Sequence, residues 1–155
     1  MATIYSDQLV IARAGRRLQP NERDGKVRAL HWDFASLPVG AIGDVLVCGK
    51  IRKGDRVLMG QEAHSALTSG GGTATGSYGT YAIDSDGQSL GAVDDADRFL
   101  VATSFEAAGG TPLADTIAHF IGYEATADFF VCCVNSVEAF ATAGRVTGVL
   151  LVVND

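Results

Sequence analysis

Long hydrophobic runs and secretion signals are missing from this chain of 155 residues. No apolar run approaches the roughly 20 residues that cross a bilayer, and residues 1–25 lack the apolar core of a signal peptide. These absences argue against a membrane partner and favour a protein made in the cytoplasm. Proline is also rare, with three residues, and aromatic residues make up only 8% of the chain.

Cysteine is scarce as well: Cys48, Cys132 and Cys133 are odd in number and lack the spacing of a metal site. Because successive side chains of a strand point to opposite faces, the adjacent Cys132 and Cys133 do not share a face. We interpret all three as small apolar residues of a reduced protein, rather than as a disulfide framework.

Motifs for catalysis or cofactor binding are absent too. The chain has no Gly-x-Ser-x-Gly nucleophile elbow and no paired cysteine–histidine motif. The glycine-rich segment 68–76 lacks the Gly-Lys-Ser/Thr ending of a phosphate-binding loop, and we interpret it as a flexible loop. His31, His64 and His119 lie far apart in the sequence, outside any metal motif. The sequence therefore predicts no catalytic residue, no cofactor and no metal.

Two alternatives to that negative prediction remain open. One is a cupin-like site built from the three histidines, which would make the protein an enzyme. The other is a calcium-binding turn at Asp84 and Asp86, although the residues that follow do not complete an EF-hand. A turn in which the aspartates bond locally to the backbone is the favoured interpretation.

Apolar residues and glycine are abundant, at 47% of the chain and 19 residues respectively. This apolar content suits a packed fold, and the length suits one domain with a sizeable core. Short apolar runs separated by glycines are typical of an all-β protein with tight turns. The sequence thus predicts a mainly β, single-domain sandwich.

Two dense apolar runs near the C-terminal end, 129–134 and 149–153, carry the most information. Each is short and rich in β-branched or aromatic residues, so each predicts a strand. Neither alternates with polar residues, whereas a sandwich strand needs only one apolar face. We therefore predict that strands 128–134 and 146–153 bury their second face against a partner subunit. The predicted interface residues are Phe129, Val131, Cys133, Val149, Leu151 and Val153.

Other segments are also read from their patterns. Residues 26–34 alternate, with Leu30, Trp32 and Phe34 on one face. Residues 43–60 predict two strands joined by a basic turn, in which we expect Gly54 to supply a positive φ. Two short helices are expected, one from Asp94 or Asp95 to about 108 and one over 111–122, beginning at Thr111 with Pro112.

Charge is distributed unevenly along the chain. Residues 1–56 hold ten of the twelve basic residues and carry a net charge of +4, whereas the remainder carries −10. This asymmetry suits docking of a basic arm on an acidic surface, with a solvated charged segment as the alternative. Overall acidity and the lack of aromatic residues among the basic ones argue against nucleic-acid binding. We interpret 1–25 as an extended arm and 26–155 as the sandwich domain.

The order of these elements resembles that of the head decoration, or cement, proteins of tailed bacteriophages. The residues that carry the resemblance are 1–6, 25–28, 43–46, 51–58, 97–103, 107–109 and 141–144, of which the strand–turn–strand at 51–58 matches best. It implies a β-sandwich of jelly-roll type that forms homotrimers on the outer surface of the virion. Its partners would be the major capsid protein and further copies of this chain.

On this resemblance, the basic arm contacts the capsid. The predicted contact residues are Ile4, Tyr5, Arg13, Arg16, Arg17 and Arg23. The main alternative function is a ligand- or carbohydrate-binding adhesion module, which requires exposed aromatic side chains. Trp32, Tyr78, Tyr81 and Tyr123 are the candidates.

Overall fold

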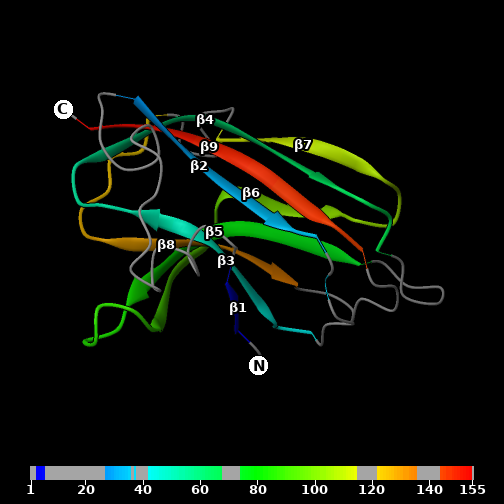
Figure 1. Cartoon of the computed structure of the whole chain (residues 1–155), viewed down its shortest axis with the longest axis horizontal. Helices are drawn as coiled ribbons and strands as arrows, with labels where there is room; N and C mark the ends of the chain where they lie inside the picture. The colour runs from blue at the N-terminus through cyan, green and yellow to red at the C-terminus, as the bar shows by residue number, and fades with distance from the viewer. Residues whose placement is uncertain are drawn as a thin grey trace.

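Two packed β-sheets make up the part of the chain described by the computed structural model, which comprises residues 3–5, 27–35, 37, 42–67, 74–114, 122–135 and 144–154 (Figure 1). Within these residues, the first sheet has the order β1–β3–β8–β5–β6: β1 (Thr3–Tyr5), β3 (Val45–Ile51), β8 (Phe129–Asn135), β5 (Thr75–Ile83) and β6 (Leu90–Ser104). The second has the order β2–β9–β4–β7: β2 (Val27–Phe34), β9 (Val146–Asn154), β4 (Asp55–His64) and β7 (Gly109–Leu113). The predicted sandwich of jelly-roll type is confirmed.

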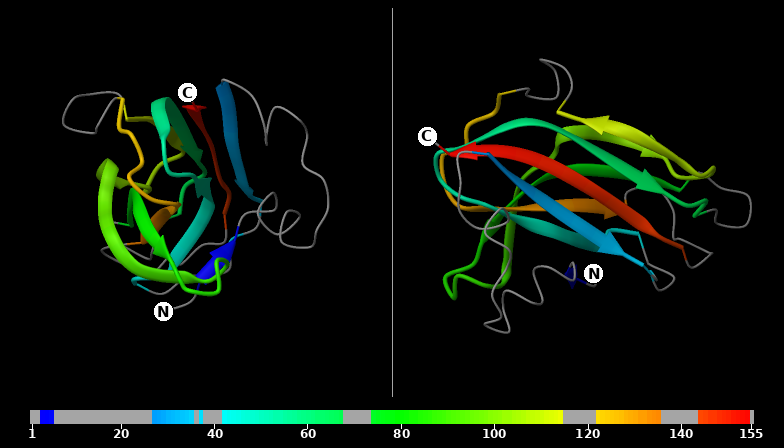
Figure 2. Two further views of the ribbon diagram at one scale, coloured as in Figure 1. Left: turned by 90° about the vertical axis from the view of Figure 1, so that its left-hand side faces the viewer. Right: turned by 45° about the horizontal axis from the view of Figure 1, so that its top comes forward.

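The two sheets face each other in the rotated views (Figure 2). The main core of buried side chains draws on strands of both sheets. Trp32 and Phe34 of β2 enter it as the alternating pattern predicts, together with Leu150 and Val152 of β9. A glycine makes room for the indole: a Cβ at Gly148 would lie 2.2 Å from Cζ2 of Trp32. The sequence pattern of β2 therefore fixes which face is buried, and Gly148 admits its largest side chain.

The two expected helices are wrong within the described residues. Asp94 does not cap a helix: its carboxylate accepts hydrogen bonds from Thr80 Oγ1 (2.8 Å) and Arg98 Nη2 (2.9 Å). Residues 90–104 form the long strand β6, whose register against β5 shifts repeatedly, so neighbouring Phe99 and Leu100 are both buried. These bulges hide the period of two and imitate a helical pattern.

The second expected helix began at Thr111, but 109–113 form β7. Pro112 lies in this strand, which is the edge of its sheet, where a missing backbone donor is tolerated. Residues 115–121 of the expected helix lie outside the described residues. No helix in the described part of the chain is long and apolar enough to cross a bilayer.

The first residues of the predicted arm belong to a sheet. β1 pairs in parallel with β3, with Thr3 opposite Val45 and Tyr5 opposite Val47. The remaining arm positions, including Arg13, Arg16, Arg17 and Arg23, lie outside the described residues, so the arm beyond Tyr5 and the domain boundary at residue 25 stay predictions.

Candidate interaction surface

Three of the six predicted interface residues lie inside the sandwich. Phe129, Val131 and Cys133 of β8 belong to the core between the sheets and are at most 7% exposed. The opposite face of β8 is covered as well, because Phe130 and Cys132 pack in a second cluster with Val45, Val47 and Tyr81. β8 therefore satisfies both its apolar faces within one chain and has little surface to offer a partner.

The other three predicted residues lie on the outer face of the second sheet. Val149, Leu151 and Val153 of β9 are half-buried, and their strand lies between β2 and β4. The register places Val153 between Val27 and Arg56, and Leu151 between Ala29 and Met59. Directly opposed residues on one face of a sheet are in side-chain contact range. An apolar surface thus runs across three strands.

A β-bulge in β4 enlarges this surface. The register against β9 shifts between Val57 and Met59, so that Leu58 and Met59 both project outward. Leu58 is 37% exposed, Met59 56% and Val27 54%. Isolated exposed apolar residues are ordinary, but contiguous ones indicate an interaction site. Sequence reasoning missed these three, although the unbroken apolar run 57–59 was a signal of a bulge.

In the turn between β3 and β4, every backbone N–H of residues 52–54 donates a hydrogen bond, and the side chains of Arg52 and Lys53 are exposed. Arg52 N–H donates to Asp55 Oδ2 (2.6 Å), and Lys53 N–H donates to Asp128 Oδ1 (3.0 Å). Gly54 N–H donates to Ala125 O (2.8 Å), and Gly54 has the positive φ, +85°, that was expected of it. The Lys53 hydrogen bond also lowers the pKa of Asp128.

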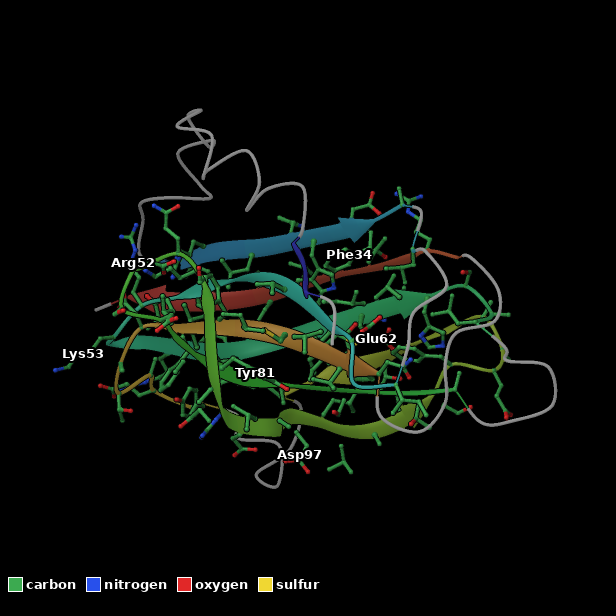
Figure 3. All side chains as sticks on the ribbon, turned by 90° about the horizontal axis from the view of Figure 1, so that it is seen from below. Phe34, Arg52, Lys53, Glu62, Tyr81 and Asp97 are labelled. Atoms are coloured by element: carbon green, nitrogen blue, oxygen red, sulfur yellow. The ribbon has the colours of Figure 1, made fainter. Side chains whose placement is uncertain are left out.

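A buried ion pair fixes the base of this turn. Arg28 of β2 and Asp55 of β4 form a hydrogen-bonded salt bridge across β9, with side chains 7% and 0% exposed. Such a pair needs good geometry, because desolvation of both charges opposes it. The side chains of Arg52 and Lys53 themselves make no ion pair with any described residue, and both point away from the end of the sandwich (Figure 3).

The opposite end of the same outer face is a shallow groove of mixed polar and apolar lining. It is lined by His31, Asp33, Gln61, Arg145 and Thr147 among others. Arg145 donates to both oxygens of Asp33, at 2.9 and 2.6 Å, and this lowers the pKa of Asp33. Because the two charges neutralise each other, this end presents less net charge than the turn.

The histidines are not brought together. His31 is exposed on β2, His64 is buried at the end of β4, and His119 lies outside the described residues. His64 Nδ1 lies 2.9 Å from Glu62 Oε2, and Nε2 lies 3.1 Å from the Ala107 carbonyl oxygen. The side chain of Glu62 is completely buried (Figure 3). Glu62 and His64 thus form a buried hydrogen-bonded pair within the sandwich. The signal for it in the sequence was two ionisable residues two positions apart in a strand.

Acids and cysteines likewise have structural partners. Asp86 accepts hydrogen bonds from the backbone of Gln88 and Ser89, both 2.7 Å, as expected of a local aspartate turn. Cys48, Cys132 and Cys133 are buried thiols, and burial raises the pKa of each. No group of three metal-ligating side chains occurs in the described ranges.

The aromatic residues required by the adhesion alternative are mostly internal. Trp32, Tyr78 and Tyr81 are 2%, 0% and 8% exposed. Tyr123 is half-buried, packs edge-on against Phe99, and lies 4.4 Å beneath the Arg98 guanidinium. None of the four offers an open ring for a sugar, so the apolar outer face of β2, β9 and β4 remains the best-supported interaction surface.

Comparison with known proteins gives similarity to solved structures and no match in sequence. No family model matches the chain, and no curated protein matches it in sequence. A chain in the capsid of Ralstonia phage GP4 shares its fold with a TM-score of 0.71 and 19% identity, covering 99% of both chains. A chain in the capsid asymmetric unit of cyanophage Pam1 gives 0.62 and 18%, covering 92% of this chain and 96% of that one.

A third likeness is to a chain in the acidic stable capsid structure of Helicobacter pylori bacteriophage KHP30. Its TM-score is 0.53 and its identity 15%, covering 84% of this chain and 90% of that one. At these identities the likeness establishes a shared fold. The coverage adds that the three matched chains are similar to this one in length.

Proposed function

We propose that this protein is a non-enzymatic structural protein of a phage virion that decorates the outer capsid surface and stabilises it as a homotrimer bridging capsid subunits. The observation that carries the proposal is the match, over 99% of both chains, with a chain of a phage capsid. The matched capsid chain has about the same length as this one, 155 residues, so it is a small protein of that capsid. The best-matching segment of the resemblance to decoration proteins, 51–58, spans the β3–β4 turn and the start of β4, which is one of the three strands of the apolar outer face.

Physical reasons favour this role. A protein that reinforces a shell requires complementary surfaces and no reaction chemistry, and many copies acting together multiply modest affinities. Burial of apolar surface contributes roughly 25 cal/mol per Å² before the costs of association. The outer face of β2, β9 and β4 supplies such surface, while the acidic remainder of the chain favours solubility.

The basic arm is the proposed contact with the major capsid protein. Four arginines at 13, 16, 17 and 23 follow β1 within a chain of net charge −6. An acidic patch on the shell would complement them. Ile4 and Tyr5 belong to the same proposed contact and lie in β1 at the edge of the sheet.

Binding to shells is the direct test. Particles of the phage that encodes this chain, prepared from a deletion mutant that lacks it, should bind the purified protein saturably and then withstand higher temperatures before releasing DNA. Replacing the four arm arginines by glutamate should weaken binding at least about tenfold, the loss expected when attraction becomes repulsion. Particles that neither bind nor gain stability would refute the proposal.

The trimer is tested separately. Light scattering or sedimentation should give three times the chain mass of 16.1 kDa. Leu151→Asp should dissociate the assembly, because it places a charge in the apolar face. Ile42→Asp is the matched control, since Ile42 is 59% exposed at a position outside this face. If wild type and Leu151→Asp gave the same mass, the apolar outer face would not be part of the trimer interface.

A further inference from the structure

The apolar outer face and the basic turn form one continuous surface. We define the docking face as Val27, Leu58, Met59, Arg52 and Lys53, with the half-buried residues of β9 between them. Val27 shares a rung with Val153 and Arg56, and Asp55 begins β4 immediately after the turn. Apolar contact and positive charge therefore lie side by side, which is the composition of an interface with an anionic partner.

A complementary surface exists on the same chain. The β5–β6 hairpin and the start of β6 carry Asp84, Asp86, Asp94, Asp95 and Asp97, with no basic residue before Arg98. Arg98 pairs with Asp94 and Asp95, at 2.9 and 3.4 Å. Asp84 and Asp97 are exposed and make no ion pair with any described residue.

The acidic hairpin also has an apolar centre. Val93 is 56% exposed and pairs with Tyr81, close to the Asp84–Gly87 turn. Asp97 and Lys53 lie on different sides of the molecule (Figure 3).

One chain thus presents two separate apolar surfaces with opposite net charge beside them. At the turn, Asp128 and Glu124 pair with Lys50 and Arg56, which leaves the charges of Arg52 and Lys53 in excess. In the hairpin, the acidic residues outnumber Arg98.

Symmetry makes this pairing significant. A ring of three identical chains is closed by heterologous contacts, in which a surface of one copy meets a different surface of the next. Two basic faces in an isologous contact would repel each other. A trimer therefore requires two complementary surfaces of this kind on each chain.

We infer that the docking face of one copy binds the acidic hairpin of the next copy, with Arg52 and Lys53 facing Asp84 and Asp97. This inference rests on the trimer of the proposed function and names its two surfaces. Leu58, Met59 and Val93 supply most of the affinity, since exposed ion pairs contribute little individually. The charges set which surface meets which and speed association.

The rigid turn suits this role. Because its backbone donors are all bonded and its base is held by the Arg28–Asp55 pair, Arg52 and Lys53 project from a preformed site. Preorganised groups lose less conformational entropy on binding than groups on a loose loop.

Charge reversal on each surface tests the contact. Arg52→Glu/Lys53→Glu and, separately, Asp84→Lys/Asp97→Lys should each weaken trimer formation roughly tenfold or more. Glu106→Lys, another exposed acid outside the hairpin, is the matched control and should leave the mass unchanged. Circular dichroism and a melting curve check that each variant is folded.

The decisive variant combines all four reversals in one chain. It has an acidic docking face and a basic hairpin, so attraction returns and the trimer should reassemble. Persistent dissociation of this folded variant overturns the inference, as does an unchanged mass in either double variant. Wild-type association should also weaken with added salt, because exposed charges are screened, and indifference to salt would contradict the proposed pairing of charges.

These outcomes are separable from those of the proposed function. A protein that trimerises through the two surfaces but binds no shell would retain the inference and lose the capsid role. A trimer that binds shells and is unaffected by the four charge reversals would retain the capsid role and overturn the inferred contact.

Discussion

Replacing Asp55 by alanine will lower the free energy of unfolding by about 3–5 kcal/mol, because it leaves the buried guanidinium of Arg28 without its counter-charge. Arg28 and Asp55 have side chains 7% and 0% exposed, so water does not screen the loss. The substitution also removes the acceptor for Arg52 N–H at 2.6 Å. In a chain of this size the melting temperature should fall by about 10 °C. Denaturant unfolding gives the loss of free energy and a thermal scan gives the melting temperature, both followed by circular dichroism.

The double variant Arg28→Met/Asp55→Asn separates charge from shape. It removes both ions, while the asparagine oxygen still accepts the Arg52 N–H. Replacement of a buried ion pair by neutral residues of similar volume is often close to neutral, so most of the stability should return. If the double variant were as unstable as Asp55→Ala, the loss would come from packing and the ionic explanation would fail.

Replacing His64 by alanine should cost a comparable amount, about 3–5 kcal/mol, since it removes the partner of a fully buried carboxyl group. Because the Ala107 carbonyl can only accept a hydrogen bond, the proton of the ring lies on Nε2. The 2.9 Å contact between Nδ1 and Glu62 Oε2 is a second hydrogen bond, which requires a proton on one of these two atoms. Alanine removes both bonds and the packing of the ring against Phe105, whose centroid lies 4.3 Å away. Urea unfolding gives the loss directly.

Glu62→Gln is the informative control for this pair. Its amide can donate to Nδ1 while Nε2 still donates to Ala107, so both ring nitrogens keep a partner and the cost should be about 1 kcal/mol. A loss as large as that of His64→Ala would show that the charge on Glu62, rather than its hydrogen bond, stabilises the core.

The sequence by itself determined most of the strands, because their hydrophobic pattern is local. Alternation in 27–34 predicted both the strand β2 and its buried face, which Trp32 and Phe34 confirm. The positive φ of Gly54 and the aspartate turn at Asp86 followed from residue types whose conformational preferences do not depend on distant contacts.

β6 could not be found in this way. Its bulges place Phe99 and Leu100 in the interior together and remove the period of two on which strand prediction depends. Inward-facing Arg28 was equally invisible, because its partner Asp55 is 27 residues away and meets it only across a third strand.

The location of the candidate interaction surface was decided by tertiary structure. β8 and β9 look alike in sequence, with both faces apolar, and from the sequence both were expected to meet a partner. In the folded chain the second face of β8 is buried in one cluster with Val45, Val47 and Tyr81, whereas that of β9 lies between Val27 and Met59, which are themselves exposed. A strand's sequence records how apolar its faces are; which chain buries them depends on neighbours that only the sheet order supplies.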